Sequence, residues 1–445
     1  MICESTLSTR PKEPLTKSYG TFSELIEGAI EKRDTRQRNR LDDLEAALST
    51  VVEEQMLSDV PLGCFLSGGL DSSLVAALMQ RHSTQPVRTF AVGFFDARFN
   101  EAPHAAAVAR HLRTDHTEFI LSENDALDII MDLPKIYDEP FADSSQIPTI
   151  LLCRKARDSV TVALTGDGAD EVFGGYNSYV LGPRLLSKLQ RVPRGLRRSG
   201  GQIVSAFVPS ITRENGWMSH FASGIRLPAT ALDKATKFAL YLNSIDDLPT
   251  LYKHFSRGIY KPEDLMRDAI TAPDPNFDFP VKGAEWMMAM DSVNYLPSDI
   301  LVKVDRAGMA ASLETRMPFL DARVITAAWE LPIEMKISDG QGKQALRKIL
   351  YRHVPRDLIE RPKQGFAIPL DHWLRGALCE WGEDLLSDDA LINLLGLEAP
   401  VIRKLWRMHQ SGSANNGTKL WTILMLLDWL RYYRHDILFA QATDI

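Results

Sequence analysis

The sequence is short of several features that would mark a membrane or secreted protein. No apolar run approaches the ~20 residues that a membrane-spanning helix needs, and the polar N-terminus lacks the apolar stretch of a secretory signal. The four cysteines are scattered without a CxxC pair, which argues against a disulfide framework or a cysteine zinc site and favours buried free thiols. We therefore expect a cytoplasmic protein with no membrane segment.

Excess basic charge is missing as well. The formal net charge is −7, and a general nucleic-acid binder would need a basic surface to meet the phosphate backbone, so no nucleic-acid partner is expected. One segment is an exception, because residues 173–213 contain seven basic and no acidic residues. This segment predicts either a solvated loop or a surface for an anionic ligand or partner.

A length of 445 residues predicts more than one domain. Residues 1–40 are mostly polar and are expected to form an N-terminal extension. Residues 41–180 alternate strand and helix patterns, which predicts an α/β domain whose parallel sheet has helices on both faces. Residues 181–445 show mainly helical spacing and are expected to form a helical region that completes the active site. The expected strands are 60–66, 87–92, 117–121 and 160–164, and the expected helices include 41–52, 74–79, 101–112, 123–130, 148–157, 231–252, 281–296 and 421–433.

A glycine-containing loop, residues 67–73, joins the first expected strand to a helix. Such a loop points backbone N–H groups and the positive end of the helix dipole at one place, which favours anion binding. Gly68 and Gly69 let phosphate oxygens approach the backbone, and Asp71 supplies a carboxylate for Mg²⁺. The loop also offers the hydroxyl groups of Ser67, Ser72 and Ser73. A purely structural turn is the alternative interpretation.

A second glycine-rich cluster, residues 165–176, follows the strand expected at 160–164. Ligands of open α/β sheets bind beyond the carboxyl ends of the strands, so the two loops are expected to face one crevice. Asp170 could share Mg²⁺ with Asp71, while Asp167 could orient the substrate or accept a proton. An acidic surface turn is the alternative. No GxxxxGKS/T pattern is present, so a lysine for the phosphates must come from elsewhere in the chain.

The motifs together resemble the asparagine synthetase family, specifically its C-terminal synthetase domain with a pyrophosphatase-type loop. The resemblance covers residues 40–435 and includes seven separated stretches in order. They are 58–63, 67–73, 137–145, 165–176, 301–306 with 314–321, 342–347 and 363–366.

The resemblance implies the adenine nucleotide alpha-hydrolase-like fold and ATP with Mg²⁺ as cofactors. A carboxylate would attack the α-phosphorus of ATP, pyrophosphate would leave, and an amine would displace AMP. By position, Leu66 and Val92 would contact the adenosine through backbone groups, and Thr165 and Gly166 would line the nucleotide site. Asp71 and Asp170 would hold Mg²⁺. The remaining implied site residues are Asp167 for adenylate formation, Lys343 for charge on the phosphates and Lys363 as a second phosphate contact.

Two departures from the family pattern affect the expected substrates. Asp167 stands where the asparagine-forming branch often has Glu, so the carboxylate, aspartate or a related acid, stays open. Only 66 residues precede the phosphate loop, and family members usually carry about two hundred residues of glutaminase there. We therefore expect a stand-alone synthetase domain that uses ammonia, an amine or a separate glutaminase subunit, and a homodimer stays open.

The sequence is compatible with three functions. The first is an asparagine synthetase-like, AMP-forming amide ligase. The second is a natural-product or peptide amide ligase that resembles β-lactam synthetases or lasso-peptide cyclases, for which the basic segment could suit a larger acidic ligand. The third is a catalytically inactive nucleotide-binding regulator, against which the presence of Asp71, Asp170 and Lys343 argues.

Overall fold

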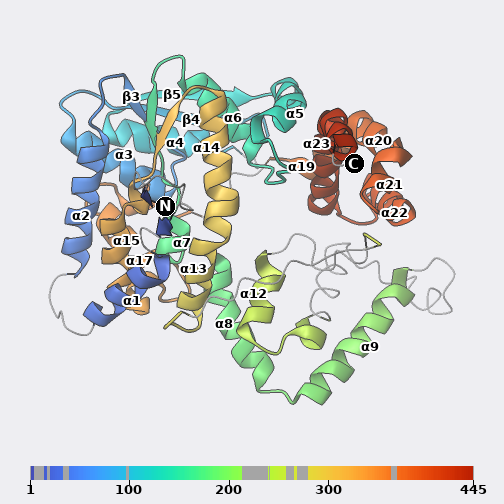
Figure 1. The fold of residues 1–445 in the computed structure, drawn as a ribbon. Helices are drawn as coiled ribbons and strands as arrows, with labels where there is room; N and C mark the ends of the chain where they lie inside the picture. The colour runs from blue at the N-terminus through green and yellow to red at the C-terminus, as the bar shows by residue number, and fades with distance from the viewer. Residues whose placement is uncertain are drawn as a thin grey trace, which may run out of the picture.

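The fold is that of a computed structural model (Figure 1). The structure describes these parts of the chain: residues 2–4, 15–17, 21–33, 40–96, 100–212, 239, 241–256, 265–267, 279–361 and 368–443. Among them, no helix combines the length and the apolarity that crossing a membrane would require.

Five parallel strands form the central sheet in the order β5–β4–β3–β6–β7. Their bounds are β3 (Leu62–Phe65), β4 (Arg88–Phe94), β5 (Asp115–Leu121), β6 (Val162–Leu164) and β7 (Glu314–Arg316). The four strands predicted from the sequence are all present. β7 was not predicted, because three residues with charged ends show neither an apolar run nor an alternating pattern. A separate antiparallel pair joins β1 (Ile2–Glu4) to β2 (Leu15–Lys17).

Side chains of the central strands alternate between two hydrophobic cores, as the pleat of a strand requires. On β4, Phe90 and Val92 belong to one core and Ala91 belongs to the other. The Ala91 side is covered by α1 (Phe22–Arg33), α2 (Arg40–Gln55), α3 (Leu70–His82), α4 (Ala102–Leu112), α7 (Ala169–Phe173), α13 (Ala284–Val293), α15 (Ala322–Trp329) and α17 (Gln344–Leu350). The other side is covered by α5 (Glu123–Tyr137), α6 (Gln146–Ala156) and α14 (Leu301–Ala310). The predicted α/β class with helices on both faces is confirmed.

The region after residue 180 is mostly helical, as expected. α8 (Asn177–Gln190) and α12 (Leu248–Ser256) meet at a small separate core. Figure 1 shows these two helices and α9 (Arg194–Thr212) below the sheet. The C-terminal helices extend the α5–α6 core: α19 (Leu370–Arg375), α20 (Cys379–Ser387), α21 (Asp389–Leu394), α22 (Ala399–Gln410) and α23 (Gly417–Thr443). Short elements complete the fold: η2, a π-helix (Leu296–Ile300), η3, a 3₁₀ helix (Pro318–Leu320), α16 (Ile333–Lys336) and α18 (Arg356–Ile359).

Of the helix expected at 231–252, the structure describes residues 239 and 241–252; these are helical at 239, at 241–244 and, in α12, from Leu248, with a break at 245–247. The division of the chain at residues 40 and 180 stays a prediction, although β7 and helices α13 to α17 contribute to the packing around the sheet. Of the cysteines, Cys64 and Cys153 are buried free thiols and Cys379 is a half-buried one.

Candidate active site

The loop between β3 and α3 is a compact, hydrogen-bonded turn. The hydroxyl oxygens of Ser67 and Ser72 lie 2.9 Å apart, and the backbone N–H of Ser67 donates to Ser72 Oγ at 3.1 Å. Gly68 has a φ of +70°, and a Cβ there would lie 2.6 Å from the backbone nitrogen of Ala105 on α4. Only glycine combines this backbone conformation with so close a neighbour. Gly69 is the N-cap residue of α3, which directs the positive end of that helix at the loop.

The second glycine-rich loop packs directly against the first. A Cβ on Gly166 would lie 2.8 Å from the backbone nitrogen of Ser72 and 3.0 Å from Cβ of Asp71. Thr165 is buried, and its N–H donates to the carbonyl of Arg316 on β7 at 2.9 Å. The two loops predicted to face one crevice are therefore neighbours at the carboxyl edge of the sheet.

Lys343 joins these loops through two ion pairs. Its Nζ lies 2.6 Å from Oδ2 of Asp71 and 2.7 Å from Oδ1 of Asp170, although the lysine comes from the N-terminal end of α17. Two glycines make this approach sterically feasible. A Cβ on Gly175 would lie 2.1 Å from Cε of Lys343, and one on Gly342 would lie 2.0 Å from a backbone carbonyl of the second loop. The lysine sought for a site without a Walker motif thus lies between the two proposed metal ligands.

The charge on Lys343 is maintained by its partners. Burial alone would lower its pKa, but the charges of Asp170 and Asp71 outweigh burial and raise the pKa of Lys343 above its ordinary value. The donor set also fits a hard divalent cation, because Mg²⁺ is commonly held by one or two carboxylates together with substrate phosphates. Within the described residues no three His, Cys, Asp or Glu side chains form a metal cluster by themselves. Asp71 and Asp170 therefore suit a Mg²⁺ ion whose remaining ligands come from the phosphates of a bound nucleotide.

Asp167 occupies a different environment from Asp170. Burial raises the pKa of Asp167, while the positive charge of Lys303 acts in the opposite direction. Its backbone N–H lies 3.4 Å from Oγ1 of Thr165. A carboxyl group with a raised pKa is a stronger proton acceptor than an ordinary aspartate.

Lys303 belongs to a network to which sequence analysis assigned no role. Its Nζ donates to Oδ2 of Asp143 at 2.8 Å and to Oγ of Ser145 at 2.9 Å, and the lysine is 8% exposed. Burial and the charge of Asp143 raise the pKa of Asp299, which lies on the π-helix η2, to about 7. Sequence contained one usable signal: Lys303 falls among the buried positions of an otherwise amphipathic helix, where a lysine requires a partner.

Three further side chains border the site. Glu171 is 1% exposed and accepts a hydrogen bond of 2.5 Å from the hydroxyl of Tyr176. Burial raises the pKa of Glu171 to about 7, although the Tyr176 hydrogen bond lowers it. Arg361 pairs with Glu101 at 3.2 Å, and its Nη2 lies 3.5 Å from the carbonyl of Ser67. Arg361 was not predicted, because nothing in its local sequence distinguishes it from a surface arginine.

The remaining predicted ligand-binding residues divide into two groups. Leu66 and Val92 lie on neighbouring chain segments at the carboxyl side of the sheet, where the Leu66 N–H donates to the carbonyl of Phe90 at 2.8 Å. Their contact with adenosine stays a prediction. Lys363 lies outside the described residues, so its role as a phosphate contact also stays a prediction.

Three arginines of the basic segment after residue 172 form ion pairs within the protein. Arg194, Arg197 and Arg198 all pair with Asp246, at 2.8, 3.0 and 3.5 Å. Arg197 is 5% exposed and also donates to the carbonyl of Ile245. These three arginines therefore hold α9 against the segment before α12, and an anionic ligand would have to compete with Asp246 for them.

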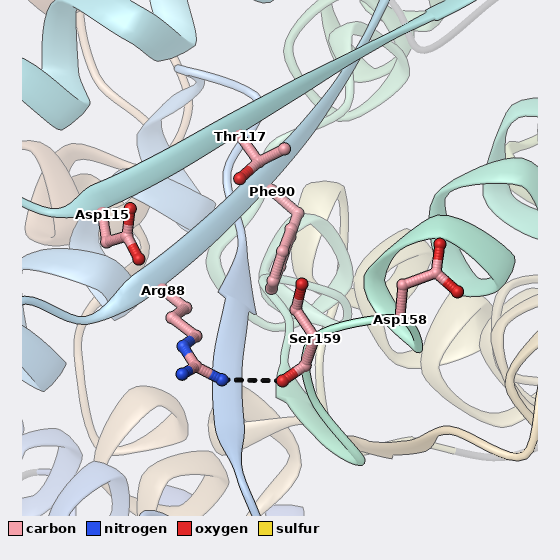
Figure 2. A pocket seen from close by; sticks show the side chains of 6 residues that line it. All are labelled: Arg88, Phe90, Asp115, Thr117, Asp158 and Ser159. Atoms are coloured by element: carbon pink, nitrogen blue, oxygen red, sulfur yellow. Dashed lines mark hydrogen bonds between the residues drawn. The ribbon is translucent and has the colours of Figure 1, made fainter.

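Two cavities lie at the opposite edge of the sheet. One, of about 360 Å³, is lined by Arg88, Phe90, Asp115, Thr117, Asp158 and Ser159 (Figure 2). A neighbouring cavity of about 670 Å³ shares Arg88 and Asp115 with it. Figure 2 shows the guanidinium of Arg88 donating to the carbonyl of Ser159, at 2.7 Å. Because β4 and β5 begin at these residues, both cavities lie at the amino ends of the strands, away from the glycine-rich loops.

A parallel sheet with helices on both faces, whose glycine-rich loops converge at its carboxyl edge, makes this an α/β protein and is consistent with the expected adenine nucleotide alpha-hydrolase-like fold. The sequence identifies the family within this class: the chain belongs to the asparagine synthase family, whose model matches residues 43–431.

Similar proteins carry related names. The chain is 34% identical over 412 residues to the putative asparagine synthetase (glutamine-hydrolyzing) of Mycobacterium bovis and to that of Mycobacterium tuberculosis, which covers 91% of this chain and 60% of the relative. It is 30% identical over 416 residues to asparagine synthetase (glutamine-hydrolyzing) 1 of Bacillus subtilis, covering 92% of this chain and 62% of that protein. The chain thus spans about 60% of the length of these relatives.

Proposed function

We propose that this chain is an ATP-dependent amide ligase that adenylates a carboxylate, aspartate or a related acid, and transfers the acyl group to ammonia or an amine. The observation that carries the proposal is the junction of Asp71, Asp170 and Lys343 at the carboxyl edge of the sheet. Membership of the asparagine synthase family supports it. A site for pyrophosphate departure needs oxygen ligands for a cation and a positive charge near the phosphates, and these three side chains provide both groups.

Each residue has a distinct task in this proposal. Asp71 and Asp170 would hold Mg²⁺, which when bound neutralises charge on the departing pyrophosphate. Lys343 would meet the charge that develops on the phosphates, and Lys363 would add a second phosphate contact. The nucleotide would lie along the loop, with the adenosine near Leu66 and Val92 and the triphosphate near Ser67, Gly68, Gly69, Ser72, Thr165 and Gly166.

The reaction balances without an additional reactant. A carboxylate oxygen forms a bond to the α-phosphorus of ATP as the bond to pyrophosphate breaks. The amine nitrogen then forms a bond to the acyl carbon as the bond to AMP breaks. The amine loses one proton, and Asp167 is the proposed acceptor because its raised pKa suits proton exchange.

Two alternatives differ in outcome. In an amide ligase of natural-product or peptide modification, a substrate amine replaces ammonia, and the carboxylate is larger. In a nucleotide-binding regulator, ATP binds without turnover. The relatives are named as glutamine-hydrolyzing enzymes, so ammonia delivered by a separate glutaminase is a further proposal about the nitrogen source.

The decisive experiment is a pyrophosphate-exchange screen over carboxylate substrates with ATP and Mg²⁺, beginning with aspartate. Exchange with aspartate supports the asparagine-forming assignment, whereas exchange only with larger acids favours the second interpretation. Each active acid is then tested for amide formation with an ammonium salt and with amines. ATP binding without exchange for any acid would contradict the ligase proposal.

A further inference from the structure

Lys343 and a divalent cation at this position would share the same two carboxylates. The ammonium contacts Oδ2 of Asp71 and Oδ1 of Asp170 at 2.6 and 2.7 Å. A Mg²⁺ ion held by the two carboxylates would approach their oxygens to roughly 2.0–2.1 Å. An ammonium that stayed in contact with both carboxylates would then lie within a few ångströms of a doubly charged ion, which Coulomb repulsion disfavours.

Hydrogen bonds on both sides hold the backbone of Lys343 in place. Its N–H donates to the carbonyl of Phe173 at 3.2 Å, and its carbonyl accepts from the N–H of Arg347 at 2.9 Å. The residue has a φ of +57°, and the preceding Gly342 leaves no space for a Cβ against Gly174. The flexible four-carbon side chain is therefore the part that can reorient.

The charges of the three groups favour an exchange of partners. The formal charges of the two carboxylates and the one ammonium sum to −1, which favours the approach of a further cation. If a divalent cation neutralises Asp71 and Asp170, the ammonium of Lys343 becomes available to another anion. The nucleotide phosphates expected at the adjacent loop are that anion.

We propose that Lys343 is the resident counter-ion of Asp71 and Asp170 in the nucleotide-free protein, and that its ammonium transfers from these carboxylates to the nucleotide phosphates when a divalent cation binds. Lys343 thereby weakens metal binding in the absence of nucleotide and couples metal binding to nucleotide binding. The coupling is reciprocal, so the metal strengthens nucleotide binding by the same factor. This inference rests on the proposed role of the two aspartates as metal ligands.

The test measures Mn²⁺ binding to the full chain without nucleotide, by electron paramagnetic resonance and calorimetry. Lys343→Met should bind Mn²⁺ more tightly than the wild type, on the order of tenfold or more, because the competing cation is gone. Lys343→Arg keeps the charge and should resemble the wild type. Lys348→Met removes an exposed lysine from the same helix and should also leave the affinity unchanged. Adding Asp170→Asn to Lys343→Met should remove the gain.

An equal or weaker Mn²⁺ affinity in Lys343→Met would overturn the proposal, as would a gain that survives Asp170→Asn. A second measurement needs no Lys343→Met protein. In wild-type protein labelled with ¹³Cε-lysine, the signal that disappears in Lys343→Arg should shift when Mg²⁺ and an α,β-methylene ATP analogue are added together. An unchanged signal in the loaded protein would also overturn it. Because neither readout requires turnover, a negative pyrophosphate-exchange screen with a positive Mn²⁺ result would refute the ligase function and leave this exchange intact.

Discussion

Two deeply buried lysines of this protein lie in opposite electrostatic environments. Lys343 is 5% exposed and has two carboxylate partners at the carboxyl edge of the sheet. Lys336 is 0% exposed, and its Nζ lies 4.1 Å from the centroid of the Trp329 ring without a hydrogen-bond partner. Burial raises the free energy of either charge, yet only Lys343 has anions that compensate for it.

The difference appears directly in the two pKa values. Burial lowers the pKa of Lys336 to about 7, because the charge of Glu285 only partly opposes it and Arg33 adds to it. The pKa of Lys343 rises despite burial, because Asp170 and Asp71 are in contact with it. The depth at which a lysine is buried therefore does not show whether it is functional. The charged groups in contact with the lysine are the better indication. The same lesson applies to the two cavities, which are hollow but lie at the edge of the sheet without the glycine-rich loops.

The largest effect is expected when the paired lysine is removed. Lys343→Ala should reduce kcat by roughly a hundredfold to a thousandfold, because a charge that acts mainly on the transition state is lost. ATP affinity should change much less. Steady-state kinetics together with direct ATP binding separate the two quantities. Weakened ATP binding with normal kcat would make Lys343 an ordinary phosphate clamp.

The second-largest effect is expected when Asp71, one of the carboxylate partners of Lys343, is replaced. Asp71→Asn should lower turnover by roughly a hundredfold, since an amide oxygen is a poorer ligand for the proposed Mg²⁺ and leaves less charge stabilisation at pyrophosphate. Pyrophosphate release at saturating MgATP is the measurement. Near-normal release would exclude Asp71 as a metal ligand.

A third buried lysine tests the rule that partners determine the role. Lys303→Met removes the cation next to Asp143, and stranding that carboxylate should destabilise the fold by about 3–5 kcal/mol in urea unfolding at pH 7. Burial opposes but does not prevent the lowering of the Asp143 pKa below its ordinary 3.8 by Lys303. Stabilisation from the pair is thus present above pH 3.8 and is lost as pH falls through the lowered value. The deficit of the variant should shrink in acid, and a pH-independent deficit would indicate packing loss instead.

The smallest effect is expected at the unpaired lysine, and its sign is reversed. Lys336→Met should stabilise the protein by about 1–4 kcal/mol at pH 7 and leave kcat unchanged. The folded pKa of about 7 lies below the ordinary 10.5, so the unfolded state binds more protons between these values. Wild-type stability should therefore rise from pH 7 to 10.5, whereas Lys336→Met should lack that slope. A destabilised variant, or an unchanged slope, would show that Lys336 has a compensating partner.

Local patterns predicted much of the fold. The loop at 67–73 lies between a strand and a helix as expected, because glycine and polar residues between two apolar runs specify such a turn over a few positions. The strand β7 escaped prediction because three residues gain strand geometry only by pairing with β6. The network of Lys303 with Asp143 and Ser145 also escaped prediction, since Lys303 is separated from Asp143 by 160 positions.

The sequence by itself determined four of the five strands of the central sheet, the helices between them, the two glycine-rich loops and the chemistry of the residues within those loops. These properties depend on periodicity and residue type over short stretches, which can be read directly. Only the tertiary structure decided which cation meets which carboxylate. Lys343 and Asp71 are separated by 272 positions, and the motif around Lys343 does not show which carboxylates this lysine meets. Nor does the sequence around Lys336 show what surrounds that lysine. Their opposite charge environments arise because folding brings distant carboxylates to one lysine and an indole ring to the other.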